Sequence, residues 1–236
     1  MCDKKRKVSL IGIGTGGVKE MTERAKEEIL ASDCLIGASR MLESAACFLE
    51  QKKDIKRRDM LSEYRWDFIF SYVKEHEECS RTAVLFSGDI GFYSGAKKLY
   101  DAIERTEGLE QMEIYPVSGI SSVVYFCGKL GVSWEDVHLL SLHGRKQNLI
   151  DAVKYHEKVF VLCGEKDGIP KICCKLKEYG LGDVKVAVGT DLEHLTDQIA
   201  IHIPLYYEEK QRILEAVFLY DRYEGLCVIL ANEENI

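Results

Sequence analysis

Short apolar runs rich in β-branched residues alternate along this chain with segments of helical period, and this alternation restricts the possible folds more than any other feature. It is typical of α/β domains, in which helices cover the faces of a sheet. In the first half of the chain it predicts strands over 8–13, 34–36, 82–86 and 112–117, and helices over 23–31, 39–48, 66–76, 91–104 and 119–130. Thr22 is a good N-cap residue for the first of these helices.

The pattern restarts near Val132, where Ser133 and Asp136 have the spacing of a capping box. Beyond this point we predict strands over 137–142, 159–163, 184–188 and 225–230, and helices over 148–156 and 170–179. The segment 199–223 is apolar but has few turn or capping signals, so its secondary structure stays open. We therefore expect two α/β domains, residues 1–132 and 133–236.

Composition and charge argue against several classes of protein. The 236 residues are 46% hydrophobic and 30% charged, and no apolar run approaches the ~20 residues of a membrane span. A net charge of −7 argues against a nucleic acid as the main partner, because phosphate binding needs a clustered basic face. The nine cysteines form no C-x-x-C pair and no zinc spacing with the six histidines. We therefore expect reduced thiols, no protein-held metal and a cytoplasmic location.

The glycine-rich stretch GIGTGG begins at the end of the first predicted strand. Its Gly12-x-Gly14-x-x-Gly17 spacing matches the dinucleotide-binding fingerprint, in which a helix begins at the loop and an acidic residue ends the second strand. Here VKEM separates the last glycine from Thr22, and the second strand ends LIGASR, without a carboxylate. The spacing alone leaves two interpretations open, a tight strand-to-helix turn and an NAD-binding oxidoreductase or sensor.

A second turn of small residues lies in FSGDIGFYSGA, after the predicted strand 82–86. This strand delivers Gly88, Asp89 and Gly91 to the carboxyl edge of the sheet, where ligands bind in open α/β folds. Glycines let a ligand approach the backbone closely, and Asp89 offers an acceptor or a countercharge to a cationic ligand.

A third turn lies in PVSGISSVVYFCGKLG, where Ser118, Ser121 and Ser122 stand at the passage from a strand to a helix. Helix capping alone is the alternative interpretation of these serines. Three glycine or serine turns at the ends of three strands would line one crevice.

In this order along the chain, GIGTGG, SGDIGFY, VSGISS and SLHGR resemble the tetrapyrrole methylase superfamily, and the likeness spans nearly the whole sequence. The resemblance implies two α/β domains, each a mixed sheet flanked by helices, with the active site in the cleft between them. It also implies S-adenosylmethionine as cofactor, a homodimer, and the C-methylation of a corrin precursor in cobalamin biosynthesis. A separate C15-methylating decarboxylase would then be a partner enzyme.

The resemblance also assigns roles to single positions. It places the first turn, with Gly12, Gly14 and Gly16, beside the tetrapyrrole. The cofactor-binding positions that it implies are Gly88, Asp89, Gly91, Phe92, Gly119, Ser121, Ser122 and Cys163. The chain departs from the family where Ile90 and Ser118 replace the usual prolines, so these turns lose rigidity but no reactive side chain.

Methyl transfer from a sulfonium to an electron-rich ring carbon is an in-line displacement, so alignment and a dry pocket lined by backbone dipoles can supply most of the catalysis. We therefore predict no indispensable nucleophile. His143 is the candidate base for a proton of the macrocycle, with a structural histidine as the alternative. Arg40 and Arg145 are candidates for binding substrate carboxylates, and Arg65 is a weaker one.

The resemblance leaves the position of methylation open, because the cofactor turns would look alike throughout the superfamily. A methylase that acts at another tetrapyrrole position or on another substrate therefore stands beside the corrin precursor as an alternative.

Overall fold

The computed structural model describes residues 6–54, 56–107, 109, 112–142, 146–163, 168–182, 184–190, 198–201 and 227–232. The chain separates into two units, Met1–Ser122 and Val123–Ile236. The division falls at the start of helix α5 (Ser122–Leu130), whereas the boundary predicted after Val132 lies just beyond that helix. A boundary at Val132 stays a prediction.

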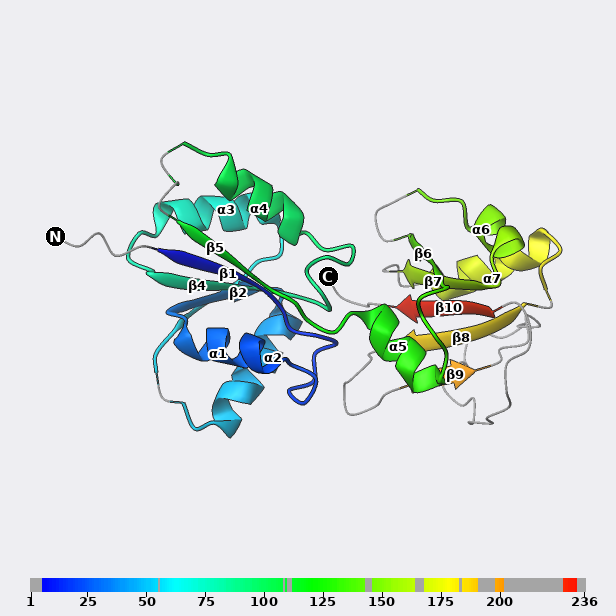
Figure 1. Ribbon diagram of the computed structural model, residues 1–236, viewed down its shortest axis with the longest axis horizontal. Coiled ribbons are helices and arrows are strands. Elements are labelled where there is room, and N and C mark those ends of the chain that lie inside the picture. Colours follow the sequence, from blue (N-terminus) through cyan, green and yellow to red (C-terminus); the bar gives the residue numbers. More distant parts are fainter. Residues whose placement is uncertain are drawn as a thin grey trace. The chain divides into compact units, whose positions relative to one another are not determined.

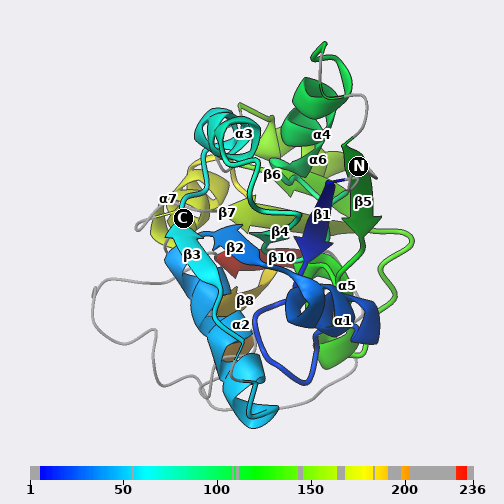
Figure 2. The same ribbon diagram turned by 90° about the vertical axis from the view of Figure 1, so that its left-hand side faces the viewer.

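The first unit is a parallel sheet with helices on both faces (Figures 1 and 2). The order of its described strands across the sheet is β3-β2-β4-β1-β5, and every described pair is parallel. Its elements are β1 (Lys7–Gly12), α1 (Glu23–Ala31), β2 (Cys34–Gly37), α2 (Ser39–Gln51), β3 (Asp59–Ser62), α3 (Trp66–Glu75), β4 (Arg81–Phe86), α4 (Ala96–Glu104) and β5 (Glu113–Val117).

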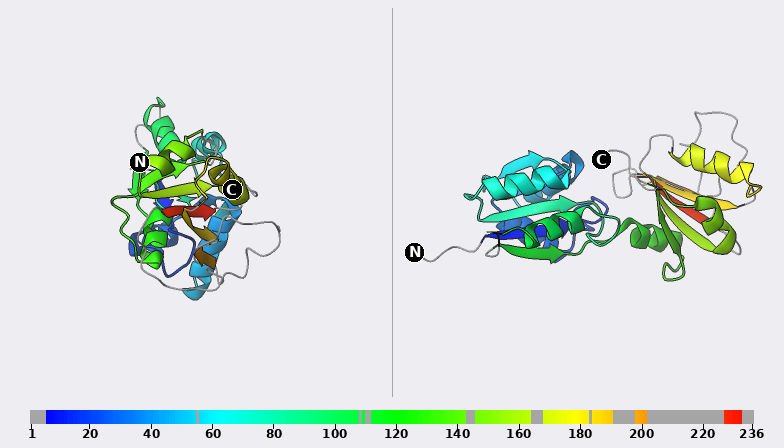
Figure 3. Two further views of the ribbon diagram at one scale, coloured as in Figure 1. Left: turned by 90° about the vertical axis from the view of Figure 1, so that its right-hand side faces the viewer. Right: turned by 90° about the horizontal axis from the view of Figure 1, so that it is seen from above.

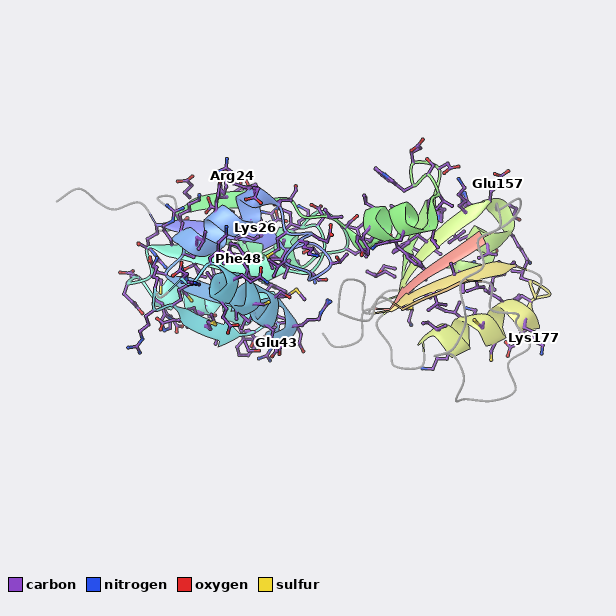
Figure 4. The ribbon with its side chains drawn as sticks, turned by 90° about the horizontal axis from the view of Figure 1, so that it is seen from below. Arg24, Lys26, Glu43, Phe48, Glu157 and Lys177 are labelled. Atoms are coloured by element: carbon purple, nitrogen blue, oxygen red, sulfur yellow. The ribbon has the colours of Figure 1, made fainter. Side chains whose placement is uncertain are left out.

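Two apolar layers hold this unit together, because successive residues of each strand face opposite sides of the sheet. Helices α1 and α2 cover the face that carries Ile11, Leu35 and Leu85. Helices α3 and α4 cover the other face, which carries Leu10, Ile36 and Val84. In Figure 4, Phe48 of α2 is labelled in the first layer, where it is 2% exposed, and Arg24 of α1 lies outside it.

Strands β1 and β4 are neighbours, yet the chain leaves them toward opposite faces of the sheet. Helix α1, which follows β1, lies on one face, and α4, which follows β4, lies on the other (Figure 1). Such a reversal is a topological switch point, and ligands of open α/β sheets bind beyond the carboxyl ends of the strands at that point. The fold therefore places the candidate site beside the ends of β1 and β4.

The second unit contains a mixed sheet, with described strand order β6-β7-β10-β8-β9 and β9 antiparallel to β8. Strand β10, the last described strand of the chain, pairs with β7 on one side and with β8 on the other (Figure 3). Helices α6 and α7 pack with β7 and β8 around one apolar core. The elements besides α5 are β6 (His138–Ser141), α6 (Leu149–Tyr155), β7 (Lys158–Cys163), α7 (Gly168–Glu178), β8 (Lys185–Thr190), β9 (Gln198–Ile201) and β10 (Cys227–Asn232).

The α/β class and most predicted elements are confirmed, including the expected N-cap at Thr22, whose hydroxyl accepts the Ala25 N–H. Asn148 also caps its helix, because its side chain accepts the Asp151 N–H. Two predicted helix starts need correction. The helices predicted from residues 91 and 119 begin later, at Ala96 and Ser122, because the preceding residues form turns. The capping-box spacing at Ser133 precedes a turn, and the predicted strand follows as β6.

A buried carboxylate organises the amino edge of the first sheet, opposite the candidate site. Glu28 of α1 is 5% exposed, and its carboxylate accepts hydrogen bonds from Lys7 Nζ at 2.8 Å, Ser9 Oγ at 2.7 Å and Arg81 Nη2 at 3.4 Å. Burial raises the pKa of Glu28, but the hydrogen bonds from Lys7 and Ser9 and the nearby positive charges outweigh it and hold the pKa below its ordinary value of 4.5. The ionised form is therefore part of the folded state.

This pKa shift predicts a loss of stability in acid. The unfolded chain takes up the proton first, so the stabilisation by Glu28 is complete above pH 4.5 and declines as the pH falls through the lower folded-state pKa. Glu28→Gln should lower the stability at pH 7 by roughly 1–3 kcal/mol and flatten the acid limb of a plot of Tm against pH. Glu23→Gln, whose side chain is 85% exposed, is the control. Equal profiles for both variants would contradict the prediction.

Candidate active site

The ends of three strands meet at the switch point, so closely that only glycine fits. A Cβ built on Gly12, the last residue of β1, would lie 2.6 Å from the carbonyl oxygen of Gly88 and 2.8 Å from the nitrogen of Gly119. A Cβ on Gly119 would overlap the carbonyl oxygens of Gly88 and Gly12. The predicted convergence of the three turns, those after β1, β4 and β5, is therefore present, and it is made by main-chain atoms.

Two hydrogen bonds join the turns after β1 and β4. The Gly14 N–H donates to the Gly88 carbonyl at 3.1 Å, and the Gly88 N–H donates to the Gly14 carbonyl at 2.7 Å, which forms an isolated antiparallel bridge. Both glycines have positive φ, 75° and 64°, a conformation that favours glycine. We call this pair the glycine bridge. Its two N–H groups are already hydrogen-bonded within the protein.

The glycine bridge argues against a dinucleotide in the first turn. The loop doubles back, so a Cβ on Gly14 would meet the carbonyl oxygen of Glu20 at 3.1 Å, and α1 begins only at Glu23. In the dinucleotide fingerprint the helix begins at the loop and its N–H groups receive the pyrophosphate. Here the glycines are used for close packing between turns, so the NAD-binding interpretation loses its structural basis.

Asp89 ties the second turn to the third. Its Oδ1 accepts the Gly91 N–H at 2.8 Å, and its Oδ2 accepts the Gly119 N–H at 3.0 Å. Its carbonyl accepts the Phe92 N–H at 3.1 Å, which closes a four-residue turn from Asp89 to Phe92. The carboxylate is half-buried and lies beside the exposed Gly91, so it also places a negative charge at the carboxyl edge of the sheet.

The remaining predicted residues of these turns lie close by. Ser121 and Ser122 are buried, and a Cβ on Gly88 would lie 3.6 Å from the Ser121 Cα. The ring of Phe92 packs edge-to-face on that of Tyr93 at 4.8 Å. Tyr93 has a φ of 50°, an uncommon conformation for a residue with a side chain. Strained residues of this kind cluster at functional sites.

Arg40 reaches the site from the first turn of α2. Its Nη2 donates to the Ser87 hydroxyl at 3.1 Å, and its Nη1 donates to the Thr15 carbonyl at 3.5 Å. Gly16 lies over the same region, because a Cβ there would be 3.8 Å from Arg40 Nη1. The sequence analysis missed Thr15 and Ser87, although each is a hydroxyl residue directly beside a glycine of the glycine bridge.

Four further predicted residues lie outside these three turns in the sequence. His143 and Arg145 lie outside the described residues. Cys163 is buried in the second unit, in the apolar core that α6 and α7 share with the sheet. Arg65 is occupied at the surface by Glu63, whose carboxylate it binds through Nη2 at 2.8 Å and Nε at 3.1 Å, lowering the pKa of Glu63 to about 2.

Comparison with known protein families adds an independent finding. The family model described as Tetrapyrrole (Corrin/Porphyrin) Methylases matches residues 7–196, a span that contains all three turns. The chain is a member of this family. It is accordingly a methyltransferase, and the predicted two-domain α/β fold is that of its structural neighbours. Among the described residues of this tetrapyrrole methylase, no helix is long and apolar enough to cross a membrane.

Two curated relatives and one solved structure are similar to this methylase. The probable cobalt-precorrin-7 C(5)-methyltransferase of Methanocaldococcus jannaschii is 31% identical over 159 residues, which cover 66% of this chain and 70% of the relative. The cobalt-precorrin-7 C(5)-methyltransferase of Salmonella typhimurium is 28% identical over 192 residues, covering 81% and 88%. The crystal structure of a precorrin-6Y methylase from Archaeoglobus fulgidus shares the fold, with a TM-score of 0.59, 23% identity and coverage of 88% and 93%.

Proposed function

We propose that this tetrapyrrole methylase transfers the methyl group of S-adenosylmethionine to C5 of cobalt-precorrin-7, in the anaerobic route of cobalamin biosynthesis. One observation supports this most. Three small-residue turns converge at the switch point of a family member whose similar curated relatives carry that activity in their names. The family membership supports methyl transfer to a tetrapyrrole, and the relatives support the ring position.

The residues at the convergence fit a cationic cofactor. The carboxylate of Asp89 supplies a negative charge, and the adjacent Gly91 leaves the main chain exposed to a ligand. When bound, S-adenosylmethionine supplies a methyl group on a positively charged sulfur. We assign its methionine part to the second turn and its neighbours in the third. These residues are Gly88, Asp89, Gly91, Phe92, Gly119, Ser121 and Ser122, with Cys163 of the second unit on the adenosine side.

The protein's own contribution would be alignment and electrostatics. The main-chain dipoles of the three turns are fixed, so they can stabilise the shift of positive charge from the sulfonium toward the ring without reorganising. The glycines keep side chains out of the path between donor and acceptor. The first turn, with Gly12, Gly14 and Gly16, would lie beside the macrocycle. Arg40 and Arg145 would hold its carboxylates through paired N–H groups, and His143 would accept a proton from the ring.

Self-association is part of this proposal, in line with the homodimer implied by the family resemblance. Exposed apolar side chains cluster in one segment at the edge strand β3 and the start of α3, namely Met60, Tyr64, Trp66 and Phe68. The stretch KRRDMLSEYRWDF carries four basic and three acidic residues, whereas the whole chain has a net charge of −7. Two copies would therefore meet here without strong repulsion. Light scattering on the purified protein tests for the dimer, and a monomer would contradict this part.

Two further assignments belong to the proposal. We place the enzyme in the cytoplasm, and, in line with the family resemblance, we expect a separate C15-methylating decarboxylase to act on the same corrin precursor.

Ligand binding and product analysis test the function. In calorimetry we expect S-adenosylhomocysteine to bind and NAD to give no heat. Incubation with S-adenosylmethionine and a panel of corrin precursors, with and without cobalt, should give one added methyl group, and NMR of the product should place it at C5. NAD binding without S-adenosylhomocysteine binding would overturn the methylase proposal. Methylation at another carbon would favour a sister methylase.

A further inference from the structure

The position of Arg40 suggests a role besides contact with substrate. Helix α2 begins after Ala38 without a side-chain cap, and its first turn has no acidic residue. A cation at a helix N-terminus is unfavourable, because the helix dipole is positive there. In the part of the chain that the structure describes, no carboxylate pairs with Arg40, so an ion pair does not compensate for this cost. Its hydrogen bonds go instead to the first and second turns.

These bonds bracket the glycine bridge. The Ser87 hydroxyl accepts the bond from Nη2, and Ser87 directly precedes Gly88. The Thr15 carbonyl accepts the bond from Nη1, and Thr15 directly follows Gly14. The bridge itself consists of two hydrogen bonds between two glycines, the residues that lose most conformational freedom on ordering. A side chain anchored on α2 that holds both neighbours reduces the freedom of the two turns together.

We infer that Arg40 is a positioning residue, whose guanidinium holds the first and second turns in register across the switch point and thereby sets the affinity of the site for its cofactor. The part of this inference that concerns cofactor affinity rests on the proposed function. The part that concerns the hydrogen bonds from Arg40 to the two turns does not. A residue that only contacted substrate carboxylates would leave both the glycine bridge and cofactor binding unchanged. The two roles therefore differ in what they alter.

Three variants of the full chain test this inference. Arg40→Gln removes both bonds of the guanidinium. Ser87→Ala removes its 3.1 Å bond and leaves its 3.5 Å bond to Thr15 in place, so it serves if the first variant folds poorly. Arg81→Gln is the matched control, because the Arg81 side chain makes one described hydrogen bond, of 3.4 Å to Glu28, at the amino end of β4, whereas Ser87 follows the carboxyl end of that strand. For each protein, amide hydrogen exchange at Gly14 and Gly88 is measured by NMR, together with the dissociation constant for S-adenosylhomocysteine and the Tm.

Arg40→Gln should exchange the two bridge amides about tenfold faster than the wild type and bind S-adenosylhomocysteine about tenfold more weakly, while Ser87→Ala should show smaller changes in both. Arg81→Gln should leave both quantities unchanged even where its Tm falls. Unchanged bridge exchange and affinity in Arg40→Gln would overturn the inference. If the wild-type protein does not bind S-adenosylhomocysteine, the proposed function fails, and the exchange measurement still decides whether Arg40 ties the turns.

Discussion

Gly119→Ala is expected to disrupt the strand-end cluster and abolish cofactor binding. The added methyl group would overlap the carbonyl oxygens of Gly88 and Gly12 and would lie 2.6 Å from the carbonyl carbon of Gly12. These are main-chain atoms of two other strand ends, so no side-chain rotation relieves the contact. Overpacking of this kind costs roughly 3 kcal/mol or more where the backbone must move. Urea denaturation and calorimetry with S-adenosylhomocysteine measure the two losses.

Gly128→Ala is the matched control for this substitution. Gly128 lies within α5, and a Cβ there would meet no atom within 4 Å. Alanine is the better helix former, so this variant should be more stable than the wild type by about 0.5–1 kcal/mol and should bind the cofactor normally. If the two alanine variants had equal stability and equal affinity, the close packing of the three turns would not matter for the protein.

Asp89→Ala should weaken the binding of S-adenosylhomocysteine more than tenfold, or by ~1.4 kcal/mol. The substitution removes the acceptor of the Gly91 and Gly119 N–H groups, so the second turn loses its tie to the third. It also removes the negative charge at the carboxyl edge, which would reduce affinity for the cationic S-adenosylmethionine further. Calorimetry with the two ligands separates these effects, because only one of them is a sulfonium.

Two companion variants sharpen the interpretation of Asp89. Asp89→Asn retains one acceptor oxygen and the size of the side chain, so it should lose less affinity for S-adenosylhomocysteine than Asp89→Ala. Asp101→Ala removes a carboxylate of α4 that pairs with Lys97 at 3.1 Å, away from the turns, and should change neither affinity. A dissociation constant for Asp89→Ala equal to that of the wild type would remove Asp89 from the site.

Local signals in the sequence accounted for most of the elements. Thr22 and Asn148 cap helices because a side-chain oxygen can accept a nearby main-chain N–H, and this depends only on residues within one turn. Strand β4 was predictable from its β-branched and apolar residues. Strand β3 was missed because its residues are mostly exposed and give no alternation of buried and polar positions. The start of α4 was misplaced because Tyr93 adopts a positive φ, which its residue type does not indicate.

The candidate site was predictable in composition but not in its connections. Glycines and serines at strand ends indicated a common edge, and the structure brings Gly12, Gly88 and Gly119 together there. The glycine bridge and the hydrogen bonds of Arg40 form because β1 and β4 are neighbours in the sheet. The order of strands in the sheet determines this, and no local sequence pattern indicates it. The function of Thr15 and Ser87 could not be inferred for the same reason.

The turn from Asp89 to Phe92 is formed although the chain has Ile90 where the family resemblance leads us to expect proline. Ile90 occupies the second position of this turn, at which a pyrrolidine ring would preset the backbone. Here the Asp89 side chain fixes the backbone of the turn instead, because it accepts the Gly91 N–H. The geometry of the loop thus rests on hydrogen bonds to a carboxylate rather than on a covalent ring, and the same carboxylate ties the loop to the turn after β5.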